Sequence, residues 1–163
     1  MGNDGAQAFY EIFRSKLRFL EAEWQFSRHE VHSEVSWITH LVYVYRDIAL
    51  DFEFEGRELS VDESICQWSL WKQRYSAGTR SVYLLAMFPE LAPRHNAEVA
   101  RMTKDINRLQ SKALKTGEIS IIREWLSAEA DRYAFWLMAA GREEFLRRAA
   151  SGLAIELPTA DEG

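Results

Sequence analysis

An alternating segment at residues 48–55 constrains the fold most. Every second position is apolar, and acidic residues fall on the opposite parity. The apolar set is Ile48, Leu50, Phe52 and Phe54, and the acidic set is Asp51, Glu53 and Glu55. Successive side chains of a β-strand point to opposite faces of the sheet. The segment therefore predicts a strand with one face in the core and one acidic, solvated face.

The neighbouring segments extend this strand into a sheet. Residues 37–45 are apolar on both parities and rich in aromatic and β-branched side chains, which predicts a central strand covered on both faces. Only two residues connect this run to the next, a length typical of a hairpin. A further strand is expected over residues 58–67. We predict an antiparallel meander of three or four strands over residues 37–67, with residues 25–35 open between a loop and an edge strand.

Helical periodicity flanks the meander on both sides. Residues 6–24 repeat apolar side chains at steps of three and four, which predicts an amphipathic helix. Residues 79–150 are expected to be helical, and residues 152–163 to fray. The sequence thus predicts an α+β fold with an N-terminal helix, a meander and a helical C-terminal half.

Within the helical half, four local signals mark the ends of the predicted helices. A short helix is expected to begin at Thr79 or Ser81. Asn96 is a suitable N-cap for the next helix, and Gly117 would end it. Gly141 marks a bend or pause in the last helical region.

Length and composition bound the kind of protein. The chain has 163 residues, which suits a single domain spanning 1–163, and 47% hydrophobic residues exclude a disordered chain. Its one cysteine, Cys66, cannot form an intramolecular disulfide, which favours a reducing compartment. The sequence has no secretory signal and no apolar run of membrane-spanning length. We expect a cytoplasmic protein that does not enter the membrane.

No catalytic or cofactor motif is present. The segment His29-Glu30-Val31-His32 lacks the spacing of a zinc-protease helix, because position 33 is Ser33. No glycine-rich phosphate loop or nucleophile motif occurs elsewhere. His40 could act as a base beside Asp51 or Glu53, although such a histidine is more often structural. We therefore predict no enzyme activity, no catalytic residue, no metal and no cofactor.

Two charged surfaces are candidate binding sites. The net charge is −5, yet residues 94–116 carry six Lys or Arg against two Asp or Glu. An acidic sheet face, with nearby exposed aromatics, could hold a basic protein partner. Its predicted residues are Asp51, Glu53, Glu55, Asp62, Trp68 and Trp71. The alternative is a basic helix face, typical of a solvated surface or of a nucleic-acid contact, formed by Arg101, Lys104, Arg108, Lys112 and Lys115.

The N-terminal part of the chain places an aromatic amphipathic helix, FYEIFRSKLRFLEAEW, before a meander, WITHLVYVYRDIALDFEFEGRELSV. In this order of elements the first 65 residues resemble small bacterial immunity proteins that neutralise polymorphic or secreted toxins. The resemblance implies a cytoplasmic, non-enzymatic antitoxin that masks a cognate toxin. Binding residues vary between members of this class, so the resemblance assigns none here.

These observations favour a non-catalytic, protein-binding domain whose partner is a protein such as a cognate basic toxin. One alternative is a small enzyme or ligand-binding domain with a pocket between the sheet and the C-terminal helices. Another is a nucleic-acid-associated regulator using the basic helix at residues 97–116, which we do not favour because the chain as a whole is acidic.

Overall fold

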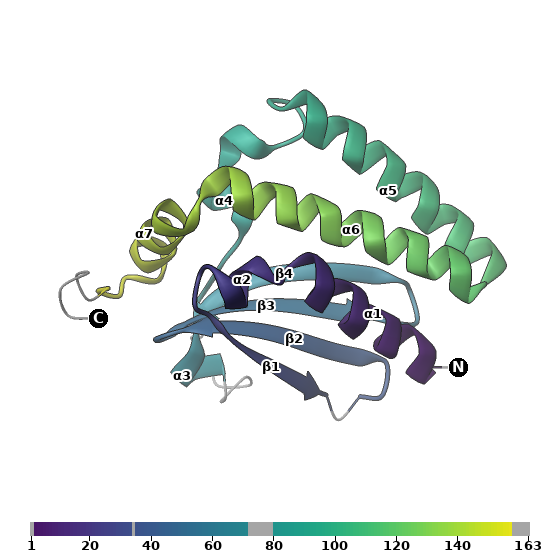
Figure 1. The fold of residues 1–163 in the computed structure, drawn as a ribbon, viewed down its shortest axis with the longest axis horizontal. Helices are drawn as coiled ribbons and strands as arrows, with labels where there is room; N and C mark the ends of the chain where they lie inside the picture. The colour runs from purple at the N-terminus through teal and green to yellow at the C-terminus, as the bar shows by residue number, and fades with distance from the viewer. Residues whose placement is uncertain (1, 34, 72–79, 158–163) are drawn as a thin grey trace.

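The computed structural model of the chain describes residues 2–33, 35–71 and 80–157. It confirms the predicted α+β class: an N-terminal helix, an antiparallel sheet and a helical C-terminal half (Figure 1). In chain order the elements are α1 (Gly2–Lys16), α2 (Phe19–Ala22), β1 (Ser27–His32), β2 (Ile38–Tyr45), β3 (Ile48–Glu55), β4 (Ser60–Gln67), α3 (Trp68–Trp71), β5 (Ser81–Val82), α4 (Leu84–Met87), the 3-10 turn η1 (Pro89–Leu91), α5 (Ala97–Thr116), α6 (Ile119–Ala140) and α7 (Arg142–Leu153).

The sheet is a meander in which each strand pairs with the next, in the order β1-β2-β3-β4-β5. It has five strands, more than the three or four expected. The extra strands are β1, which settles the open assignment of residues 25–35, and the two-residue β5. β5 pairs only with Ile65 and Cys66 of β4. Beyond that point, no described strand covers the outer edge of β4.

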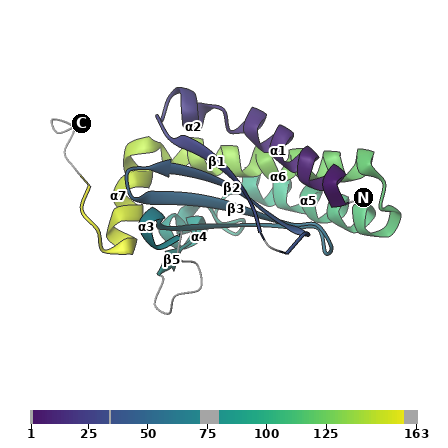
Figure 2. The same cartoon turned by 90° about the horizontal axis from the view of Figure 1, so that it is seen from below.

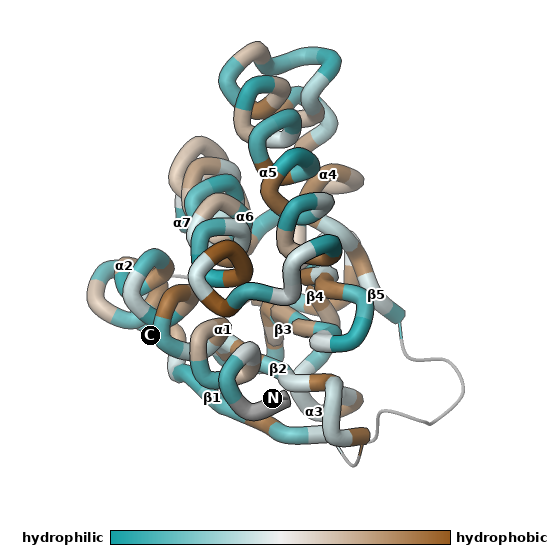
Figure 3. The backbone as a smooth tube through the Cα atoms, turned by 90° about the vertical axis from the view of Figure 1, so that its right-hand side faces the viewer, coloured by the Kyte–Doolittle hydropathy of each residue, from teal (hydrophilic) through white to brown (hydrophobic). Residues whose placement is uncertain are grey.

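Helices cover one face of the sheet, which we call the inner face. α1 and α6 lie on this side, α5 packs on α6, and the short α3 lies on the opposite side (Figures 1 and 3). Figure 2 shows the same arrangement from below. The apolar parity of β3 supplies the centre of the core: Phe52 is fully buried, and its ring contacts those of Phe13, Tyr43 and Tyr133.

The predicted helix at residues 6–24 is divided into α1 and α2. Its apolar stripe is buried as expected, from Phe9 through Leu17 to Trp24. The helix breaks after Lys16, and Gln25 then adopts a positive φ of 65°, which turns the chain into β1. The periodicity predicted the buried face correctly because both short helices present it to the same core.

The long C-terminal helices follow their predicted signals. The Asn96 side chain accepts a hydrogen bond from the Val99 N–H at 3.1 Å and so caps α5. Gly117 ends that helix with a φ of 64°, and Gly141 separates α6 from α7. The short helix expected from Thr79 or Ser81 is wrong in its start. Thr79 lies outside the described residues, Ser81 is in β5, and α4 begins only at Leu84.

Candidate functional site

The outer face of the sheet, opposite α1 and α6, is partly covered by α3. Trp71 packs with Val42, Val44, Ala49 and Cys66 in a small second core. Trp71 is only 8% exposed, so its predicted role as an exposed aromatic anchor is wrong. α3 follows β4 directly and folds back over the sheet, which accounts for the burial of this tryptophan.

Trp68 lies beside Trp71 in α3. It is half-buried, with its ring centroid 5.1 Å from that of Trp71 and 4.8 Å from that of His29. The two tryptophans therefore form a structural cover over one half of the outer face. Beyond this cover, toward the turn between β3 and β4, the outer face carries the acidic residues Glu53, Glu55 and Asp62.

Asp51 is the polar centre beneath this cover, and its predicted place on a solvated acidic face is wrong. It is 6% exposed. Its carboxylate accepts a hydrogen bond from Trp71 Nε1 at 2.9 Å and lies 3.0 Å from His40 Nδ1. A buried carboxylate needs such partners, because burial of an unpaired charge is costly. Asp51 thus ties β3 to β2 and α3.

A polar depression, which we call the acidic hollow, continues from this pair to the open edge of β4. Its volume is about 430 Å³. The described residues that line it are His40, Asp51, Glu53, Asp62, Glu63, Ser64, Tyr83 and Tyr133. Three of the predicted acidic site residues, Asp51, Glu53 and Asp62, therefore meet here. No Lys or Arg is among these described lining residues.

Glu53 and Asp62 form the exposed part of the acidic hollow. They are directly opposite each other on β3 and β4. The Glu53 side chain is 42% exposed, and Asp62 is also exposed. On its other side Glu53 pairs with His40 of β2, whose Nε2 lies 3.8 Å from the Glu53 carboxylate. The hollow thus combines two accessible carboxylates with a buried histidine–aspartate pair.

Glu55, the remaining predicted acidic residue, lies outside the acidic hollow. Its carboxylate accepts the Glu58 N–H at 2.6 Å and the Arg57 Nε–H at 3.2 Å. Its side chain is only 18% exposed. Glu55 therefore closes the turn between β3 and β4 and is only partly exposed on the outer face, so its predicted role in partner binding stays a prediction.

Glu63 is a member of the acidic hollow that the sequence pattern did not identify. It sits between Val61 and Ile65 on the inner parity of β4, beyond the residues that pair with β5. Its carboxylate accepts the Leu84 N–H at 3.2 Å. Burial raises the pKa of this carboxyl to about 7, and the charge of Asp62 adds to the increase. The sequence did contain one indication of its role: Glu63 is an acidic residue between the apolar Val61 and Ile65 on the same face of the predicted strand.

A second buried carboxyl lies on α6. Glu129 is 5% exposed and binds Arg132 at 2.7 Å, and Arg132 also donates to Thr103 of α5 at 3.0 Å. Burial raises the pKa of Glu129 to about 7, although Arg132 opposes this increase. This group links α5 to α6, and none of its three residues is among the described residues that line the acidic hollow.

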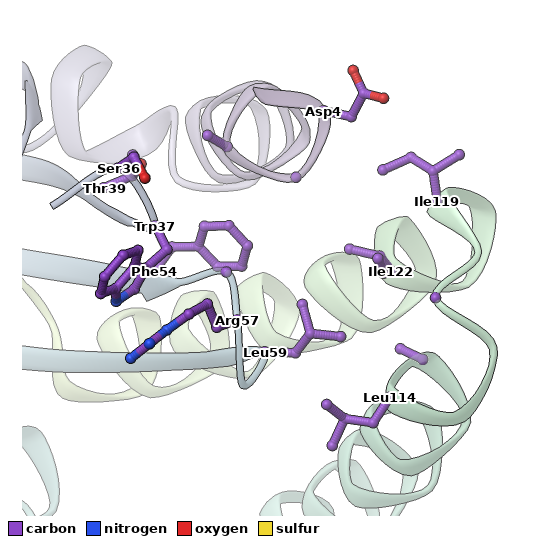
Figure 4. Close-up of a pocket in the computed structure, with 15 residues that line it drawn as sticks. Asp4, Ser36, Trp37, Thr39, Phe54, Arg57, Leu59, Leu114, Ile119 and Ile122 are labelled. Carbon is purple, nitrogen blue, oxygen red and sulfur yellow. The ribbon is translucent and has the colours of Figure 1, made fainter. Parts of the chain in front are cut away.

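A different depression, the apolar hollow, lies where β2 begins, β3 ends and α5 turns into α6 (Figure 4). Its volume is about 400 Å³. Its side-chain lining includes Trp37, Phe54, Leu59, Leu114, Ile119 and Arg57. The sequence analysis did not identify this site, because its residues come from four separate segments. The sequence did contain one indication of this site: the apolar residues Leu114 and Ile119 occur among polar and charged neighbours, Lys115 and Glu118.

The basic face of α5 is exposed along its length. Its charge is partly compensated, since Arg101 pairs with both Glu98 and Asp105, and Arg108 also approaches Asp105 at 3.8 Å. Lys104, Lys112 and Lys115 are on the same exposed face. This pattern is typical of a solvated helix surface.

The described part of the chain contains no group of three or more His, Cys, Asp or Glu side chains able to hold a metal ion. None of the described helices has the length and apolar character required to cross a membrane. Searches against protein-family models, curated proteins and solved structures find no match to the chain.

Proposed function

We propose that the chain is a non-catalytic domain that binds a basic protein partner through the acidic hollow. The observation that carries this proposal is the direct pairing of Glu53 with Asp62 across β3 and β4. A Lys or Arg side chain of a partner would meet two carboxylates side by side on adjacent strands. Such paired acidic groups on a sheet favour a basic partner over an acidic one.

The surroundings of this pair support the same proposal. Asp62 is exposed and lies on the part of β4 with which no described strand pairs. The buried pair of His40 and Asp51 holds the floor of the hollow in place. A rigid acidic surface accelerates association with a basic partner and disfavours acidic ones.

The partner class we propose is a toxin that the domain neutralises. Residues 9–24 and 37–61 carry the pattern that resembles bacterial immunity proteins, and the acidic net charge of −5 suits a basic target. The gene neighbourhood tests this assignment. A toxin gene directly upstream, with a product neutralised by the wild type and not by the variant described next, would support it. A metabolic operon at that place would overturn it.

The acidic-hollow mechanism is tested by reversing Glu53 and Asp62 together to Lys. The matched control reverses two exposed acidic residues on α6 and α7, Glu124→Lys with Glu143→Lys, and gives the same change in net charge. The probe is decalysine, measured by calorimetry in low salt and again at physiological salt. We expect the hollow variant to weaken binding about tenfold and the control about twofold or less.

Equal weakening in both double variants would overturn the mechanism, because net charge alone would then account for binding. Circular dichroism and thermal unfolding of each variant verify that the fold is intact. Asp51 is left unchanged in this test because it is buried and bonded, so its replacement would act through stability.

A second candidate function is that of a small enzyme, and the contact between His40 and Asp51 favours it. A carboxylate that orients a histidine is the arrangement found in general-base catalysis. The probes are p-nitrophenyl acetate and p-nitrophenyl phosphate, with His40→Gln as the variant. Turnover that is lost in a folded His40→Gln protein would support an enzyme. Equal rates in both proteins would overturn it.

A further inference from the structure

Exposed apolar side chains gather around the apolar hollow. The large hydrophobic side chains that are exposed among the described residues are Trp37, Tyr83, Leu114, Ile119 and Met138. Three of these, Trp37, Leu114 and Ile119, line the apolar hollow. Their exposed fractions are 36%, 52% and 43%. An apolar surface concentrated at one depression is typical of a ligand-binding site.

The floor of the apolar hollow is rigid. Phe54 is 2% exposed, and its ring stacks on that of Phe9 of α1 with centroids 5.3 Å apart. The same ring lies against the α1 backbone, 3.4 Å from an ideal Cβ position at Gly5. α5 and α6 form the opposite wall and are joined by the tight turn at Gly117. The hollow is therefore formed before any ligand arrives.

One cation lies at the rim. The Arg57 guanidinium carbon is 3.9 Å from the centroid of the Trp37 ring, and the Arg57 side chain is 61% exposed. Its Nε donates to Glu55, while the described residues provide no hydrogen-bond acceptor for its two Nη atoms. Figure 4 shows Arg57 alongside Trp37, with the other charged lining residue, Asp4, pointing away on the far side. The rim therefore offers two N–H donor groups on a positive charge.

We infer that the apolar hollow binds an amphipathic carboxylate, with a medium-length acyl chain in the hollow and the carboxylate on Arg57. The volume of about 400 Å³ falls within the range of small-molecule sites. The lining is apolar, which fits the chain, and the guanidinium matches the geometry of a carboxylate. This site is separate from the acidic hollow, so its ligand does not depend on the protein-binding proposal.

The first experiment titrates the full chain with hexanoate, heptanoate and octanoate by calorimetry and by amide and indole NMR shifts. Each added methylene should tighten saturable binding about fourfold while the hollow still has room. Octanol tests the head group. We expect octanol to bind more weakly than octanoate, and Arg57→Gln to weaken octanoate about fivefold without changing octanol.

The second experiment compares two exposed apolar positions of α6. Ile119→Glu places a charge in the hollow and should abolish binding of both octanoate and octanol. Met138→Glu is the matched control, since Met138 is 62% exposed and does not line the hollow. It should leave both affinities unchanged, and both variants should keep the thermal unfolding temperature of the wild type within a few degrees.

Three results would overturn the inference. The absence of saturable binding would exclude the site, and equal losses in Ile119→Glu and Met138→Glu would reduce it to non-specific adsorption. Equal affinity for octanol and octanoate, unchanged by Arg57→Gln, would exclude the carboxylate class. Binding of decalysine is measured on the same samples, so failure here is distinguishable from failure of the protein-binding proposal.

Discussion

The two faces of β3 differ in what they contribute to the molecule. Its inner face presents Ile48, Leu50, Phe52 and Phe54 to the main core on the helical side of the sheet, and all four are buried. Its outer face changes along the strand: Ala49 and Asp51 are buried near α3, whereas Glu53 is half-exposed in the acidic hollow. All four residues of the inner face thus stabilise the fold by burial. The outer face divides into a half that stabilises the fold and a half that is available for binding.

The test with the largest expected effect on stability is Phe52→Ala on the inner face. Removing a fully buried ring that contacts three other aromatic rings should lower the free energy of unfolding by about 3–5 kcal/mol. Urea unfolding followed by circular dichroism measures the loss. Asp62→Ala on the exposed outer face is the control and should change stability by less than about 0.5 kcal/mol. Similar losses in both variants would remove the distinction between the faces.

The second test addresses the structural half of the outer face. Asp51→Ala leaves His40 Nδ1 and Trp71 Nε1 without their carboxylate, which should cost about 2–3 kcal/mol. Asp51→Asn keeps an acceptor oxygen and should cost less. Urea unfolding of both variants, compared with Asp62→Ala, provides the measurement. If Asp51→Ala were as mild as Asp62→Ala, the aspartate would be solvated, as the sequence pattern predicted.

The third test uses pH. Folding raises the pKa of the Glu63 carboxyl from 4.5 to about 7. Between these two pH values the carboxyl is therefore protonated in the folded state and deprotonated in the unfolded chain. The stability from this group is therefore fully present below pH about 4.5 and is lost as the pH rises through about 7. Because Glu63 is partly exposed, we expect the loss to be roughly 1–2 kcal/mol between pH 5 and pH 8.

Glu63→Gln should remove this part of the pH dependence, because the amide stays neutral and can still accept the Leu84 N–H. The variant should therefore be more stable than the wild type at pH 8 and similar to it at pH 5. The raised pKa of Glu129 makes stability fall with pH in the same direction, and this part of the pH dependence should remain in Glu63→Gln. Glu124→Gln, on an exposed part of α6, is the control. If the stability of Glu63→Gln depended on pH as steeply as that of the wild type, the raised pKa of Glu63 would be refuted.

The smallest test concerns the like-charged pair itself. Asp62→Lys places a cation directly opposite Glu53, so it should raise the free energy of unfolding by about 0.5 kcal/mol. The gain should shrink in high salt, because exposed charges are screened. Unfolding in low and high salt measures it. A loss of stability in low salt would mean that Glu53 does not attract a cation at position 62, and the proposed binding mode of the acidic hollow would fall.

The sequence predicted the elements well because local rules determine them. Strict alternation identified β3, and cap chemistry at Asn96 and Gly117 identified the ends of α5. β5 was missed because two residues carry no periodicity. The break of the N-terminal helix after Lys16 was missed because no Gly or Pro marks it. In both places, tertiary packing decides the outcome.

The candidate site was predicted less well, for a physical reason. Alternation gives the face on which Asp51 lies, yet it contains no information about what covers that face. Trp71, 20 residues later, turns the position from a surface charge into a buried acceptor. The apolar hollow is assembled from α1, the sheet and two helices. Such a site depends on contacts distant in sequence, which a periodic pattern cannot reveal.

The packing of α1 against α6 has a consequence for synthesis of the chain. Phe13 meets Tyr133, Lys16 binds Asp131, and Glu11 binds Arg123, so the first helix is completed by residues made more than a hundred positions later. While the ribosome is still making α5, the apolar stripe of α1 and the inner face of the meander have no α6 to cover them. Nascent chains stopped before α6 should therefore recruit chaperones, whereas release of the whole chain allows the core to close in one late step.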